Sequence, residues 1–84
     1  MHLIVLTPEK EIYNGQVKSV KVPGTSGQFE ILKNHAPIVA SLSEGEVRVI
    51  DTKGNKQSFV IAKGFVEVMK NEVALLVQGV TAQD

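Results

Sequence analysis

Short runs of alternating apolar and polar residues, separated by turn residues, fill this sequence almost from end to end. Such a period of two is typical of strands that have one buried and one solvated face. No segment as long as an ordinary helix carries the helical period. Because the turn signals recur about every 8–12 residues, the pattern indicates a sandwich or barrel of about eight or nine strands. We therefore expect an all-β fold.

Local signals refine this expectation along the chain. Leu3 to Leu6 and the residues before Asn14-Gly15 predict an opening pair of strands, with Asn14-Gly15 as a turn. The apolar positions then slip by one residue, which predicts a β-bulge near Lys18-Ser19. The uniform composition of the 84 residues indicates a single domain over 1–84. The polar end at 81–84 predicts a loose tail.

Composition excludes several classes of function. Nine basic and nine acidic side chains are interspersed and give no net charge, and no basic stripe carries interleaved aromatic residues. We therefore expect no nucleic-acid partner. The longest apolar runs are far shorter than the ~18 residues of a membrane span, so we expect no direct membrane insertion. The chain has no Cys, so neither disulfides nor thiolate metal sites stabilise it.

The sequence offers little that suggests catalysis. The chain has no Cys, and no Ser or carboxylate is spaced from His35 as a catalytic triad or a metal centre would require. His35 therefore reads as an ordinary loop histidine. The GxxG at Gly24 to Gly27 lacks the Lys-Ser/Thr and the helix start of a phosphate loop, so it predicts a tight turn. We expect no catalytic residue, no metal ligand and no cofactor.

Two alternatives of other classes stay open. Lys53 stands at the tip of an expected hairpin, as the modified lysine does in lipoyl and biotinyl carrier domains, although Thr52 and Gly54 resemble neither carrier motif. The chain is also compatible with a free-standing β-module that binds a peptide or small ligand.

Some expected strands are apolar on both faces, notably those within 38–40, 59–62 and 73–77. Central strands tolerate outward Val and Ala, which is one explanation. The other is that an outer face packs on a second protein, because large apolar patches are unusual on monomers.

The segment from Pro23 to Pro37 reads as a turn, a short strand and a loop stiffened by proline. Together with Thr7-Pro8-Glu9 upstream and Gly64 to Val68 downstream, it resembles the N-terminal β-sandwich domain of the epsilon subunit of bacterial F-type rotary ATP synthases. The resemblance covers nearly the whole chain. Within the segment, the matching residues are Gly27, Phe29, Ile31, Leu32, His35, Ala36 and Pro37.

The resemblance implies a flattened antiparallel β-sandwich of about eight to ten short strands. It implies a non-catalytic central-stalk subunit that couples rotation of the membrane c-ring to the gamma subunit, bound peripherally at the cytoplasmic face of the inner membrane. By matching position, it implies contacts near the junction of c-ring and gamma. The residues implied there are Gln28, Glu30, Asn34 and His35, and the outer-face candidates for gamma are Leu76 and Val60.

The resemblance also implies what this chain lacks. Many members of the family continue into two C-terminal helices, which bind ATP in some of them. Because the sequence ends at Asp84, we expect either a naturally short form or a truncated chain, in both cases without that helical hairpin and without nucleotide binding.

Overall fold

The computed structural model describes residues 1–83, and within that range every element is a strand. The all-β expectation is therefore confirmed. In chain order the strands are β1 (His2–Leu6), β2 (Glu11–Gly24), β3 (Gly27–Leu32), β4 (Ile38–Leu42), β5 (Gly45–Asp51), β6 (Lys56–Ile61), β7 (Lys63–Met69), β8 (Glu72–Gln78) and β9 (Thr81–Gln83).

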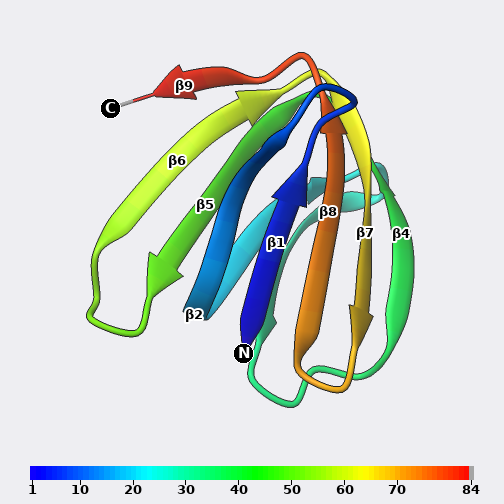
Figure 1. The fold of residues 1–84 in the computed structure, drawn as a ribbon. Coiled ribbons are helices and arrows are strands. Elements are labelled where there is room, and N and C mark those ends of the chain that lie inside the picture. Colours follow the sequence, from blue (N-terminus) through cyan, green and yellow to red (C-terminus); the bar gives the residue numbers. More distant parts are fainter. Residues whose placement is uncertain (84) are drawn as a thin grey trace.

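The long strand β2 turns one hydrogen-bonded network into two layers (Figure 1). Residues 11–16 pair with β1, whereas residues 17–21 pair with β5 on one side and residues 19–24 pair with β3 on the other. We call the layer β2, β1, β8, β7, β4 the first layer, and the layer β3, β2, β5, β6, β9 the second layer. The pairing register of β2 with β5 shifts between Val17 and Ser19, which confirms the predicted bulge. Such a bulge bends a strand and increases its twist, so it allows β2 to pass between the layers.

One strand pair differs from the antiparallel expectation, because β1 and β8 run parallel. Parallel neighbours require a long connection, and the six strands between β1 and β8 supply it. All the other pairs of the network are antiparallel.

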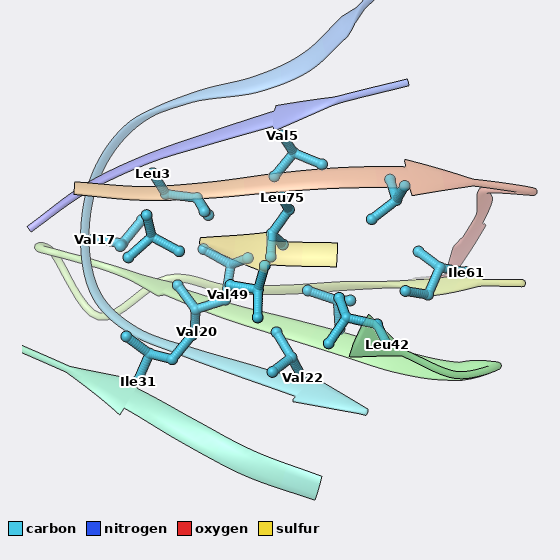
Figure 2. Packing of buried hydrophobic residues seen from close by; sticks show 14 of the residues in the cluster. Leu3, Val5, Val17, Val20, Val22, Ile31, Leu42, Val49, Ile61 and Leu75 are labelled. Atoms are coloured by element: carbon cyan, nitrogen blue, oxygen red, sulfur yellow. The ribbon is translucent and has the colours of Figure 1, made fainter. Parts of the chain in front are cut away.

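The core lies between the two layers and is built from small aliphatic side chains (Figure 2). Leu3, Val5 and Leu75 point from β1 and β8 toward Val20 and Val22 of β2. In β8 every second residue is buried, as the period of two requires. Each fully buried Val or Leu stabilises the fold by about 1.5–3 kcal/mol relative to an exposed one.

Two local expectations are wrong. Asn14-Gly15 is no turn, because both residues lie within β2 and pair with Ile4 and Leu3 of β1. The first connection is instead at Thr7 to Lys10. There the Thr7 hydroxyl accepts hydrogen bonds from the main-chain amides of Glu9 and Lys10. The tail is not loose over Thr81–Gln83, which form β9 against β6. Main-chain pairing needs no apolar pattern, so a polar sequence gave no sign of it. Asp84 lies outside the described residues.

Candidate functional site

Gln28 and Glu30 lie exposed on β3, on the same face of the strand. Gln28 is opposite Pro23, and Glu30 is opposite Lys21, which in turn faces Arg48 of β5. The outer face of the second layer therefore carries a row of charged side chains across three strands, negative at Glu30 and positive at Lys21 and Arg48. The opposite charges of Glu30 and Lys21 contribute roughly 0.2–1 kcal/mol to sheet stability, whereas the like charges of Lys21 and Arg48 oppose it. Within the described range, β3 pairs with β2 alone, so its other edge is open.

Asn34 and His35 lie in the loop between β3 and β4. The main-chain amide of Asn34 donates to Asn71 Oδ1 at 2.6 Å, and Asn71 Nδ2 donates to Asn34 Oδ1 at 3.1 Å. The amide of His35 donates to the Leu32 carbonyl at 3.0 Å, and His35 Nδ1 lies 2.7 Å from the Ala36 carbonyl oxygen. The loop is thus held to the turn between β7 and β8.

The four predicted contact residues do not form one compact site. Gln28 lies at the start of β3, whereas Asn34 and His35 come after its far end. Six residues of extended strand span about 20 Å. A single partner reaches all four residues only by lying along the open edge of β3.

Leu76 and Val60 occupy outer faces of different layers. Leu76 of β8 is 51% exposed and lies opposite Phe65 of β7 on one side and Leu6 of β1 on the other. Val60 of β6 is half-buried between Glu46 and Thr81. One flat partner surface therefore contacts one of these two residues and not the other.

The outer face around Leu76 is the apolar side of the molecule. Phe65 is 57% exposed and Val39, on β4, is 71% exposed. A depression of about 500 Å³ lies on this face, lined among others by Leu6, Phe65 and Leu76. Sequence reasoning named Leu76 but missed Phe65 and Val39, although the same period of two places both residues away from the core. We call Val39, Phe65, Leu76 and Leu6 the apolar face.

A larger hollow of about 850 Å³ lies between the turn after β1 and strand β6. Its lining includes Glu9, Lys10 and Tyr13, the last with a pKa raised by burial and further by the negative charge of Asp51. No sequence signal pointed to this hollow, because its walls come from segments far apart in the chain. No nucleophile and base are paired by a hydrogen bond among the residues that line it.

The described residues contain no group of three or more His, Cys, Asp or Glu side chains able to hold a metal ion. Within the same range there is also no helix long and apolar enough to cross a membrane. Lys53 is exposed in the turn between β5 and β6, with its main-chain amide bonded to Asp51 Oδ1 at 2.8 Å.

Comparisons with known proteins agree with the resemblance seen in the sequence. The ATP synthase epsilon chain of Chlorobaculum tepidum is 40% identical over 79 residues, which cover 94% of this chain and 90% of that protein. The epsilon chain of Leptospira borgpetersenii is 43% identical over 77 residues, but these cover only 59% of its length. The chain thus spans most of some relatives and about three fifths of others.

Solved structures share the fold. A chain in the mitochondrial ATP synthase of Euglena gracilis, in a structure of OSCP, F1 and c-ring, superposes on 95% of this chain. Its TM-score is 0.89 at 22% identity, and the match covers 51% of that chain. A chain in the central stalk and c-ring of the Tetrahymena thermophila mitochondrial ATP synthase gives a TM-score of 0.82 at 17% identity, covering 96% of this chain and 65% of its own length.

At these identities the structural likeness establishes the sandwich, and the sequence matches establish the lineage. Residues 1–83 match the family described as ATP synthase, Delta/Epsilon chain, beta-sandwich domain, and the chain belongs to that family.

Proposed function

We propose that residues 1–84 form a non-catalytic central-stalk domain of a rotary ATP synthase, which couples rotation of the c-ring to the gamma subunit. The observation that carries the proposal is the apolar face, with three side chains more than half exposed on one sheet surface of a small domain. The relatives are named ATP synthase epsilon chains, and the titles of the similar structures name the c-ring and the central stalk, which supports this assignment.

The gamma subunit is the occupant that we assign to the apolar face. Leu76, Phe65 and Val39 would be buried there, and the depression beside Leu76 offers a pocket for an anchoring side chain. Buried apolar anchors of this kind usually dominate the energy of an interface. The second layer presents Glu30, Lys21 and Arg48 outward, so Val60 is the weaker of the two gamma candidates.

The c-ring contact is assigned to the open edge of β3 and the loop beyond it. Gln28 and Glu30 present polar groups along the strand, and Asn34 and His35 present them past its end. A polar, charged contact suits a rotor junction, because charge complementarity fixes orientation more than it adds affinity. The Glu30 carboxylate would pair with a basic loop of the c-ring.

Mechanical coupling requires a stiff domain that contacts one partner on each of two sides. Here the core is continuous between both layers, and strands from both ends of the chain are joined within one network. A load applied at β3 would therefore reach β8 through paired strands and packed side chains. We place the domain peripherally, at the cytoplasmic face of the inner membrane, where it is held by its partners and binds no cofactor.

The test is co-purification with the gamma subunit of the same organism, comparing Leu76→Lys with Val60→Lys. Both variants add the same charge to an outward strand position, one on each layer. Burying an unpaired lysine at an interface is strongly unfavourable, so we expect Leu76→Lys to raise the Kd for gamma by about 100-fold or more. We expect Val60→Lys, which faces Glu46, to bind gamma as the wild type does.

Circular dichroism should show an unchanged sandwich in both variants, because neither position belongs to the core. The reverse result, with binding lost only in Val60→Lys, would assign gamma to the second layer. A wild-type protein that does not associate with gamma at micromolar concentration would refute the stalk function.

A further inference from the structure

A reciprocal pair of asparagines joins two turns that are far apart in the sequence. Asn71 uses both ends of its amide: Oδ1 accepts from the main chain of Asn34, and Nδ2 donates to the side chain of Asn34. Both residues have positive φ, 66° at Asn34 and 63° at Asn71. Asparagine tolerates that backbone region better than most residues, so each turn has the residue type its geometry favours.

Asn71 also holds a third segment. Its carbonyl accepts the amide of His2 at 2.9 Å, at the start of β1. The imidazole of His2 in turn lies 2.6 Å from Asn14 Oδ1 and 3.7 Å from Glu72 Oε1. The main chain at Asn71 is thus held in place by β1, and this fixes the position of the Asn71 side-chain amide.

The loop between β3 and β4 has little else to hold it. Four of its five residues, at 33–37, are exposed, and His35 alone is half-buried. Within the described range, the hydrogen bonds to Asn71 are the only ones that link these five residues to a different part of the chain. A segment with few buried contacts opens easily unless specific bonds retain it.

We propose that Asn71 is a positioning residue that holds the β3–β4 loop, and with it His35, in the conformation that a partner binds. The inference rests on the proposed function, because the partner is the c-ring end of the stalk. Pre-ordering the loop removes an entropy cost from binding. A residue 37 positions from Asn34 in sequence thereby determines the affinity of a contact that it need not touch.

The decisive variant is Asn71→Gly. Glycine accepts the positive φ and leaves the carbonyl bond from His2 intact, so only the two amide bonds are lost. We expect the main-chain amides of Asn34 and His35 to exchange with solvent about tenfold faster. We expect the Kd for a complex of gamma and c-ring to rise about 5- to 10-fold, mainly through dissociation.

Lys70→Gly is the matched control. It lies in the same turn with φ of 49°, it adds the same flexibility to the unfolded chain, and it leaves both amide bonds in place. We expect its loop exchange and its affinity to match the wild type. In loop exchange, Asn34→Gly should fall between wild type and Asn71→Gly, since it loses one bond of the two. Its affinity should also lose the contact that we assign to the Asn34 side chain.

Each outcome decides the matter. Unchanged loop exchange in Asn71→Gly would overturn the inference, and so would faster exchange with unchanged affinity, while in both cases the stalk function would stand. A wild-type protein that fails to bind the complex would instead refute the proposed function, and this inference with it.

Discussion

Asp51 explains, at the scale of a single residue, why the chain turns between β5 and β6. Its Oδ1 accepts from the amides of Lys53 and Asn55 at 2.8 and 2.9 Å, and its Oδ2 accepts from Asn55 Nδ2 at 3.1 Å. The carboxylate thus substitutes for the main-chain partners that a turn leaves unpaired. The bonds from Asn55, with a smaller contribution from Lys53, lower the pKa of Asp51 below its ordinary value of 3.8.

A lowered pKa gives a signed prediction. The ionised Asp51 favours the folded state above pH 3.8, and this contribution is lost as the pH falls through the lower pKa of the native protein. Asp51→Ala should therefore unfold at a lower urea concentration at pH 7, and the difference from wild type should shrink below pH 3.8. Thr52→Ala, in the same turn but without these bonds, is the control. A difference that stays constant with pH would contradict the assignment.

Strand β2 shows, at the scale of an element, that two glycines in one strand have different roles. A Cβ on Gly24 would lie 2.6 Å from the Gly27 carbonyl oxygen and 2.9 Å from the Phe29 ring, closer than side chains tolerate. A Cβ on Gly15 would lie 3.7 Å from the Tyr13 ring, an ordinary contact. The tight turn after β2 therefore requires glycine, whereas the middle of the strand does not.

Gly24→Ala should lower the free energy of unfolding by about 1–3 kcal/mol, because the turn or Phe29 must shift. Gly15→Ala should raise it by about 0.5–1 kcal/mol, because alanine loses less conformational entropy in a strand. Urea unfolding of both variants measures these two changes in the free energy of unfolding. Destabilisation by Gly15→Ala would mean that this part of β2 needs backbone freedom that its present pairing does not suggest.

At the scale of the whole molecule, every described element is a strand, which bears on nucleotide binding. A phosphate cradle needs main-chain amides at a helix start or a glycine-rich loop with a following lysine, and the described range has no helix. We therefore expect millimolar ATP to leave the thermal midpoint of unfolding unchanged. A bound ligand at 100 times its Kd would instead add about 2.7 kcal/mol to the free energy of unfolding and raise that midpoint. The gamma subunit, added as the positive control, should raise the midpoint. Saturable ATP binding by calorimetry would overturn this expectation.

Much of the fold could be predicted from local pattern, whereas the contact residues remain predictions. The tight turn after Gly24, the bulge near Lys18 and the strand character of almost every segment were correctly predicted, because each depends on neighbouring residues. The turn expected at Asn14-Gly15 was wrong because β1 supplies partners to both residues. Gln28 and His35, which one sequence motif presents together, lie a strand's length apart, and their roles as contacts remain predictions.

The sequence by itself determined that side chains alternate between a buried and an outward face along each strand, since the period of two is a property of the extended backbone. Only the tertiary structure decided which strands are neighbours, because main-chain hydrogen bonds pair any two strands and carry no residue code. That choice puts Leu76 and Val60 on opposite layers, joins Thr81–Gln83 to β6 and brings Asn71 to Asn34. The surfaces that we propose for function all depend on those long-range pairings.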